Sequence, residues 1–199
     1  MHRRAAIGTL LALLLGPAGS AAAAESYDID QRFGGIAFTV RNFGMFHTDG
    51  TFRRFTGHLT IDEAHPENTR VIVTIEMDSL ATRWAEAASM LRGASYFDIA
   101  QFPQARFEST AVLPTAPDQY DVTGRLTLRG VTQPILLHAA LIGRHPSTPP
   151  GAEDADFVIT GMLKRSAFGM TSDQNFVADR VDLRINARVR LEEPTHAGG

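Results

Sequence analysis

Residues 80–107, LATRWAEAASMLRGASYFDIAQFPQARF, interrupt a chain that otherwise alternates between apolar and polar residues. Within them Trp84, Ala88 and Leu91 recur at three- and four-residue spacing, which places them on one helical face. Most of the neighbouring residues favour helix, and a glycine stands where the helix would end. We therefore predict one short helix, at about residues 84–93, covering an open end of a β-structure.

The rest of the chain has the period of β-strand. Apolar residues alternate with polar ones in segments on both sides of the predicted helix, at residues 36–40, 52–61, 71–77, 105–113, 120–128, 135–141, 157–163 and 181–191. Residues 44–50 are predicted as a turn. Many short strands at regular spacing indicate an antiparallel sandwich or barrel, and the need to protect strand edges favours the barrel. We therefore predict an all-β, lipocalin-like antiparallel barrel of eight or more strands.

Three glycines lie in the inward register of these strands: Gly57, Gly124 and Gly161. Glycine at such positions marks a tight bend of the sheet or a close approach by another group. An eight-stranded barrel is wide enough to hold one small ligand.

Residues 1–24 have the pattern of an export signal. Arg3 and Arg4 precede an apolar run at residues 7–15, which is too short to span a bilayer, and small residues end at Ala24. We expect cleavage after Ala24 and a periplasmic location, with the general secretory route favoured over the twin-arginine route. The remaining chain suits one domain, at residues 25–192, and residues 193–199 suit a flexible tail.

Composition limits the function further. The chain has no cysteine and a formal net charge of −3, which becomes more negative when the two leader arginines are removed. Disulfides and thiol chemistry are therefore excluded, and neither a nucleic acid nor a polybasic membrane anchor is expected.

No pattern of catalytic or metal-binding residues is present. The histidines lack the spacing of paired metal ligands, and there is no nucleophile elbow. We therefore predict a protein that is not an enzyme, with no catalytic residue, no metal and no cofactor apart from a bound lipid. The alternative is a lipid-modifying enzyme in which the barrel places Asp28, Asp30, Arg41 or His47 beside the lipid.

Aromatic and methionine side chains give the stronger lead, because a barrel with a ligand cavity must line it with apolar groups. The predicted ligand-binding residues are Phe38, Val40, Phe43, Met45, Phe52, Phe55, Leu59, Trp84, Met90, Leu91, Phe97, Phe102, Phe107, Leu126, Leu128, Phe168 and Met170.

One strand is apolar in its outward register as well, at Leu136, Ala140 and Ile142. Either the strand is covered on both faces, or this stripe is a dimer surface. A third functional alternative follows: an interaction module that docks a partner through the stripe and has a filled interior.

The chain resembles the YceI-like family of exported lipid-binding proteins. The resemblance runs through the predicted domain and is carried by the motifs Tyr27-Asp28-Ile29-Asp30, Phe38-Thr39-Val40-Arg41, Phe55-Thr56-Gly57, Leu91-Arg92, Phe97-Asp98, Phe102-Pro103-x-Ala105-x-Phe107-x-Ser109, Val122-Thr123-Gly124-x-Leu126-Thr127-Leu128-Arg129-Gly130-Val131-Thr132-x-Pro134 and Arg165-Ser166-x-Phe168-Gly169.

The resemblance implies an extended barrel with a helix over one end and an apolar tunnel for an isoprenoid, an isoprenoid quinone or a fatty-acyl chain. We accordingly expect a periplasmic carrier of a long apolar lipid, and a transient membrane contact and a homodimer stay open. Family members usually carry a polar run before the Leu-Arg pair of the helix, where this chain has Ala87, Ala88 and Met90. The helix is therefore expected to present Trp84, Met90 and Leu91 to the lipid.

Overall fold

Alternating strands close into an antiparallel barrel in the computed structural model, which describes residues 25–61, 68–148 and 153–191. The predicted export signal at residues 1–24 and the predicted tail at 193–199 lie outside the described residues. The strands are β1 (Glu25–Asn42), β2 (Phe46–Phe52), β3 (Phe55–Ile61), β4 (Arg70–Glu76), β5 (Leu80–Thr82), β6 (Gln104–Ala116), β7 (Gln119–Leu128), β8 (Val131–Pro146), β9 (Glu153–Lys164) and β10 (Val177–Leu191).

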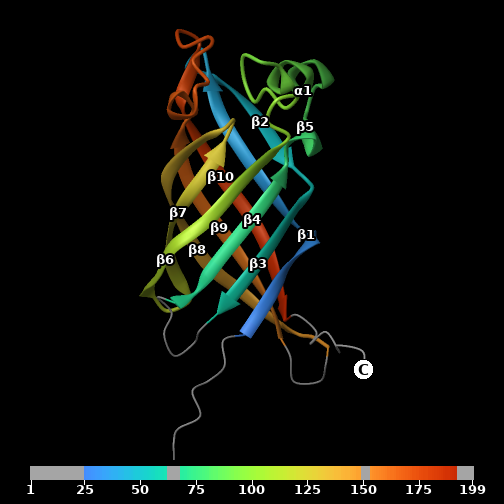
Figure 1. Cartoon of the computed structure of the whole chain (residues 1–199), viewed down its shortest axis with the longest axis vertical. Coiled ribbons are helices and arrows are strands. Elements are labelled where there is room, and N and C mark those ends of the chain that lie inside the picture. The colour runs from blue at the N-terminus through green and yellow to red at the C-terminus, as the bar shows by residue number, and fades with distance from the viewer. Residues whose placement is uncertain (1–24, 62–67, 149–152, 192–199) are drawn as a thin grey trace, which may run out of the picture.

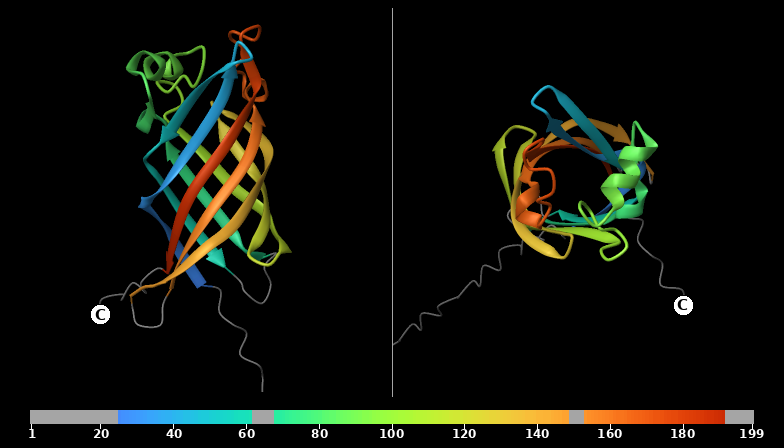
Figure 2. Two further views of the ribbon diagram at one scale, coloured as in Figure 1. Left: turned by 180° about the vertical axis from the view of Figure 1, so that it is seen from behind. Right: turned by 90° about the horizontal axis from the view of Figure 1, so that it is seen from above.

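Eight of these strands form the closed wall. They follow the order β1, β3, β4, β6, β7, β8, β9 and β10, and β10 pairs again with β1 (Figures 1 and 2). The all-β, lipocalin-like barrel is thus confirmed. Closure gives every wall strand a partner on both sides over at least part of its length, which protects these strands against edge-to-edge association.

Strand β1 changes partner along its length. Its residues 25–28 pair with β3, and its residues 36–42 pair with β2. The register with β10 shifts between Asp30 and Gly35, where the change of partner takes place. Strands β2 and β5 then extend the wall beyond β3 and β4. The predicted turn at residues 44–50 is wrong, since most of it is strand β2: pairing with β1 overrides the local composition.

The helix α1 (Ala85–Arg92) and two loops gather at one end of the barrel, which we call the apical end (Figure 2). The loops are the β1–β2 turn at residues 43–45 and the segment 169–176, which follows the 3-10 turn η3 (Arg165–Phe168). A second 3-10 turn, η2 (Met77–Ser79), joins β4 to β5. The opposite end is the basal end. The predicted helix at one end of a barrel is confirmed.

The three inward glycines make room for neighbouring side chains. A Cβ atom on Gly57 would lie 2.3 Å from Ile29, one on Gly124 would lie 2.4 Å from Phe107, and one on Gly161 would lie 2.6 Å from Leu137. Each neighbour is itself an inward-facing residue, so the glycines let large side chains fold back against the wall.

The hydrophobic core is a shell around the barrel axis. Its buried members come from the inward register of every wall strand and from the segment after α1. Leu136 and Ile142 remain exposed on the outer face of β8, so that strand is not covered on both faces. Within the described residues, no helix has the length and apolar character needed to cross a bilayer.

Candidate functional site: an apolar cavity along the barrel

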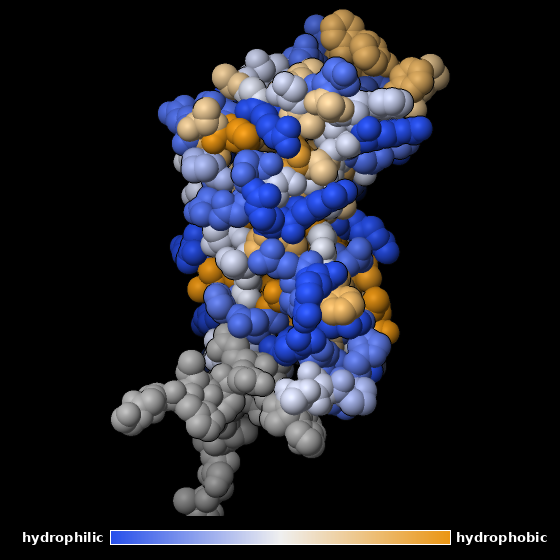
Figure 3. Space-filling view, turned by 90° about the vertical axis from the view of Figure 1, so that its right-hand side faces the viewer, coloured by the Kyte–Doolittle hydropathy of each residue, from blue (hydrophilic) through white to orange (hydrophobic). Residues whose placement is uncertain are grey.

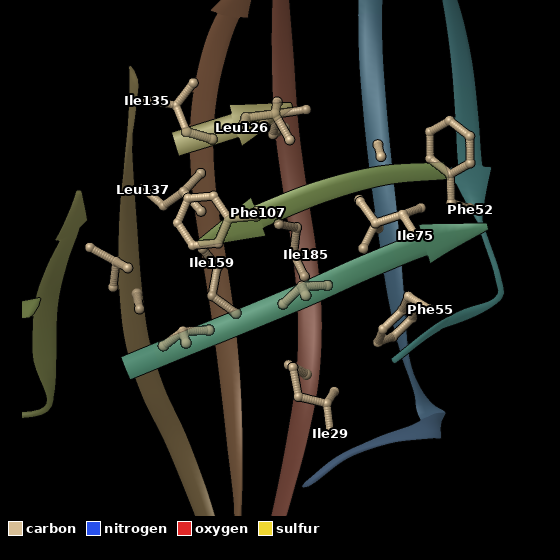
Figure 4. A pocket seen from close by; sticks show the side chains of 18 of the residues that line it. Ile29, Phe52, Phe55, Ile75, Phe107, Leu126, Ile135, Leu137, Ile159 and Ile185 are labelled. Carbon is tan, nitrogen blue, oxygen red and sulfur yellow. The ribbon is translucent and has the colours of Figure 1, made fainter. Parts of the chain in front are cut away.

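A cavity of about 820 Å³ runs inside the barrel. Its wall consists of the inward side chains of all eight wall strands, because the two-residue period of each strand turns its apolar set to the same side. Figure 4 shows Ile75, Phe107, Ile159 and Ile185 pointing from different strands into this common space. The volume is near the top of the range of about 300–1,000 Å³ found for small-molecule sites.

The cavity is long. On β10 its wall extends from Val177 to Val189, and on β8 from Ile135 to Arg144. Twelve steps of about 3.3 Å along a strand tilted by about 40° correspond to roughly 30 Å along the barrel axis. A cavity of this length and chemistry fits an extended apolar chain.

Three aromatic rings narrow the cavity at the apical end. Phe97, from the segment after α1, packs edge-on against Phe38 and Phe52, with ring centroids 5.7 and 5.5 Å away. Gly50 permits this cluster, because a Cβ there would lie 2.3 Å from the Phe38 ring. The buried Leu91 of α1 lies in the same wall. The helix therefore contributes to the cavity end through Leu91.

A buried cation also faces this end. Arg165 of η3 is 3% exposed and lines the cavity. Its guanidinium donates to the carbonyl oxygens of Met170 (2.8 Å), Ser172 (2.7 Å), Val177 (3.0 Å) and Ala178 (3.1 Å). These bonds fix the loop between η3 and β10 and satisfy a charge that would otherwise be costly to bury.

Tyr96 is the second polar group of the apical wall. Its hydroxyl donates to Oδ2 of Asp173 at 2.6 Å. Burial and the neighbouring Asp173 carboxylate raise the pKa of Tyr96 to about 12, so the phenol stays protonated. Tyr96 thereby ties the segment after α1 to the loop before β10.

The basal end has a polar rim. Thr69, Arg144 and Glu153 belong to the wall there, and Nη1 of Arg144 lies 3.7 Å from Oε2 of Glu153. Tyr27 and Tyr120 are the remaining polar residues among those that line the cavity, and Tyr27 lies toward the basal end, where it pairs with Leu59 of β3. The polar groups of the wall are therefore concentrated near the ends.

The four residues considered for catalysis do not line the cavity. His58 contacts Asp28 at 2.6 Å on the outer face, and Asp30 is bound by Arg32. His47 and Arg41 are exposed near the apical end. Among the described residues, no group of three histidine, cysteine or acidic side chains could hold a metal ion.

Eleven of the seventeen predicted ligand-binding residues lie together in the cavity wall. They come from five strands, from α1 and from the segments after α1 and η3, and they are Phe38, Val40, Phe52, Phe55, Leu59, Leu91, Phe97, Phe107, Leu126, Leu128 and Met170. Their contact with a ligand stays a prediction.

Four predicted residues lie outside the cavity because they project from the apical end into solvent. Phe43 and Met45 occupy the β1–β2 turn and are 66% and 83% exposed. Trp84 precedes α1 and is 61% exposed, and Met90 lies on the outer side of the helix. The expectation that Trp84 and Met90 face the lipid is wrong, since α1 buries Ala88 and Leu91 instead.

Two further predicted residues are packed elsewhere. The Phe102 ring lies over Gly130 in the β7–β8 turn, where a Cβ would come within 2.7 Å of it. Phe168, the last residue of η3, is 1% exposed and is buried in the core, where η3 contacts β8, β9 and β10. Both side chains support the apical end without reaching the cavity.

Much of the cavity wall is aliphatic and lies outside the predicted ligand-binding set. The prediction rested on aromatic and methionine residues, whereas β8, β9 and β10 contribute mainly branched aliphatic side chains, among them Ile135, Leu137, Ile159, Leu163, Val181, Leu183 and Ile185. The signal was available, because each of these residues lies in the inward register of its strand.

Known proteins share this architecture and sequence. The family model of the YceI-like domain matches residues 27–189. The chain belongs to the YceI family. Protein YceI from Salmonella arizonae is 40% identical over 182 residues, which cover 90% of this chain and 94% of the relative.

Three solved structures have the same fold. BcnA from Burkholderia cenocepacia is 23% identical, with a TM-score of 0.72 over 80% of this chain and 98% of its own. The YceI protein of Campylobacter jejuni is 25% identical, with a TM-score of 0.66 over 72% of this chain and 85% of its own. A polyisoprenoid-binding domain from Saccharophagus degradans is 14% identical, with a TM-score of 0.62 over 84% of this chain and 99% of its own.

Proposed function

We propose that the protein is a periplasmic carrier that holds one long apolar lipid inside the barrel. The observation that carries this proposal is the continuous apolar cavity of about 820 Å³, whose polar wall groups are concentrated near its ends. Each methylene removed from water contributes roughly 0.8 kcal/mol, so a long chain is retained without a polar anchor in the middle of the cavity.

An isoprenoid or an isoprenoid quinone is the preferred cargo, and a fatty-acyl chain is the second choice. The polyisoprenoid-binding domain of Saccharophagus degradans supports this preference through its shared fold and the function in its name. A polar headgroup would lie beside Arg165 and Tyr96 or beside Arg144 and Glu153, since these groups border the cavity ends.

Binding, and not catalysis, is the activity that the cavity favours. Arg165 is occupied by four backbone carbonyls, Tyr96 by Asp173, and Arg144 lies beside Glu153. No pair of these groups is arranged as an acid and a base around a reacting centre.

Export to the periplasm is part of the proposal and rests on the signal pattern of residues 1–24. A periplasmic carrier without disulfides depends on its hydrophobic shell for stability, which the buried residues of the barrel supply.

The test is to express the complete chain in an exporting bacterium, isolate the periplasmic fraction and extract the purified protein with organic solvent. We expect an N-terminus at Glu25 and a single class of long apolar lipid, in one copy per barrel by native mass spectrometry. Recovery of protein that is repeatedly free of lipid and that takes up no isoprenoid from detergent would contradict the proposal.

A further inference from the structure

Apolar side chains gather on the outside of the apical end. Twelve large apolar side chains are exposed among the described residues, and six of them lie at this end: Phe43, Met45, Phe46, Trp84, Met90 and Phe176. Figure 3 shows apolar groups concentrated there, above a wall that is mostly hydrophilic with scattered apolar patches. Exposed apolar groups concentrated in this way mark an interaction surface.

These side chains form two projections on either side of the cavity end. The first, the aromatic tip, consists of Phe43, Met45, Phe46 and Phe176; the second, the helix rim, consists of Trp84 and Met90. The segments that carry them, which are the β1–β2 turn, the loop before β10 and α1, lie at the same end of the barrel (Figure 2). They are raised points and not a groove, which suits a deformable surface better than a folded protein partner.

The aromatic tip is held in place. The rings of Phe43 and Phe176 lie 5.1 Å apart, and the backbone N–H of Phe43 donates to the carbonyl of Phe176 at 2.7 Å. Because these contacts already fix the tip, its apolar groups lose little further conformational entropy when they bind. The cavity wall includes Val177, the residue next to Phe176, so the tip adjoins the cavity.

Two exposed arginines accompany the projections. Arg41 precedes the aromatic tip on β1, and the Arg83 guanidinium lies 5.0 Å from the centre of the Trp84 ring. Neither arginine makes an ion pair with another described residue. Aromatic tips next to free cations are the groups that enter the headgroup region of an anionic bilayer.

We propose that the apical end docks onto the surface of an anionic lipid bilayer, with the aromatic tip and the helix rim inserted among the headgroups. The barrel then stands on the membrane with one end of its cavity toward the lipid. Docking depends on this outer surface alone, so it can be tested apart from the cargo.

The single tryptophan of the chain is a probe at the docking surface, because Trp84 lies in the helix rim. Vesicles of phosphatidylethanolamine with phosphatidylglycerol should shift its fluorescence to shorter wavelength, and brominated lipid should quench it. Vesicles of phosphatidylcholine alone should do so more weakly. An unchanged spectrum with anionic vesicles would overturn the proposal.

A variant with Phe43→Asn, Met45→Ser and Phe176→Ser should bind anionic vesicles at least about tenfold more weakly in co-sedimentation, which is the loss expected if even one of the three large apolar groups leaves water on binding. The matched control is Leu113→Ser, Leu136→Ser and Ile142→Ser, which removes three exposed apolar groups from the wall. The control should bind as the unchanged protein does. Equal binding by both variants would contradict the proposal.

The double change Arg41→Gln and Arg83→Gln should remove the preference for anionic vesicles.

Gel filtration of the same proteins tests whether a second copy of the chain covers this surface instead. If the aromatic tip joins two copies of the chain and no vesicle is bound, the surface is a dimer interface and the proposal fails. Native mass spectrometry reports the cargo separately. A protein that binds the vesicles but never contains a cargo lipid in its cavity would refute the carrier function and leave the docking proposal intact.

Discussion

At the scale of the residue, the outer wall contains a connected set of charges near the change of partner in β1. Asp156 accepts hydrogen bonds from Arg188 at 2.6 and 2.8 Å and contacts His145 at 2.8 Å. Arg190 joins Asp154 to Asp30. The set spans β1, β8, β9 and β10, so it links strands that are distant in sequence across the closure of the barrel.

These pairs predict a dependence of stability on pH. The hydrogen bonds from Arg188, with a smaller contribution from His145, hold the pKa of Asp156 at about 2, although burial opposes them. A carboxyl group whose pKa is lower in the folded protein stabilises the fold above its ordinary value of 3.8. That stabilisation is lost as the pH falls from about 4 to about 2.

The change Asp156→Asn should therefore lower the free energy of unfolding by about 1–2 kcal/mol at neutral pH. It should also make the loss of stability in acid shallower. Urea unfolding across the pH range measures both effects. Asp182→Asn is the control, because its pair with Arg180 is well exposed and should matter little. An Asp156→Asn protein with the original pH profile would refute this assignment.

The sequence predicts which residues face the cavity where the two-residue period of a strand determines the face of the sheet on which each side chain lies. Phe107, Leu126 and Leu128 face the cavity because alternation fixes the inward register. Phe43 and Met45 were assigned wrongly because a turn has no period, and their apolar character does not tell whether they point inward or out.

At the scale of the element, α1 closes part of the apical end through one narrow face. Ala88 and Leu91 are its buried residues, and the Arg92 guanidinium donates to the carbonyl oxygen of Leu80 at 2.5 Å. This bond ties the helix to β5. The helix is therefore positioned as a lid by a few contacts, with Ser89 and Met90 left in solvent.

Ala88→Asp should loosen this lid, since a carboxylate at the buried position has no partner there and an unpaired buried charge is strongly unfavourable. We expect bound isoprenoid to pass from the protein to acceptor vesicles at least about tenfold faster. Ser89→Asp places the same charge on the exposed neighbour and should leave the transfer rate unchanged. Equal rates for the two variants would show that the α1 face does not govern release.

The elements themselves were largely predictable, and their partners were not. Amphipathic spacing located the helix within a residue or two of its observed bounds, because one buried stripe suffices to define it. Composition predicts a turn where the structure has strand β2, because the residues of β2 include glycine, aspartate and histidine and become strand only through pairing with β1 and β5.

At the scale of the whole molecule, closure of the sheet and hollowness of the core go together. Eight long tilted strands enclose more volume than their inward side chains fill, and glycines such as Gly57 and Gly124 let large neighbours fold back against the wall. Sequence period predicts a barrel, but the remaining free volume depends on strand tilt and side-chain direction, which only the structure shows.

If the cavity holds the lipid, a single bulky side chain in the cavity wall should displace it. Ile159 lines the cavity from β9, whereas its neighbour Thr160 is exposed on the outer face. Ile159→Trp should reduce the cavity and obstruct an extended chain, and Thr160→Trp adds the same side chain outside it.

Native mass spectrometry measures the lipid content of the three purified proteins. Thermal denaturation first checks that each of them is folded. We expect that the unchanged protein and Thr160→Trp carry one long apolar lipid, and that Ile159→Trp carries at least about tenfold less. A folded Ile159→Trp protein with the same lipid content as the unchanged protein would contradict it.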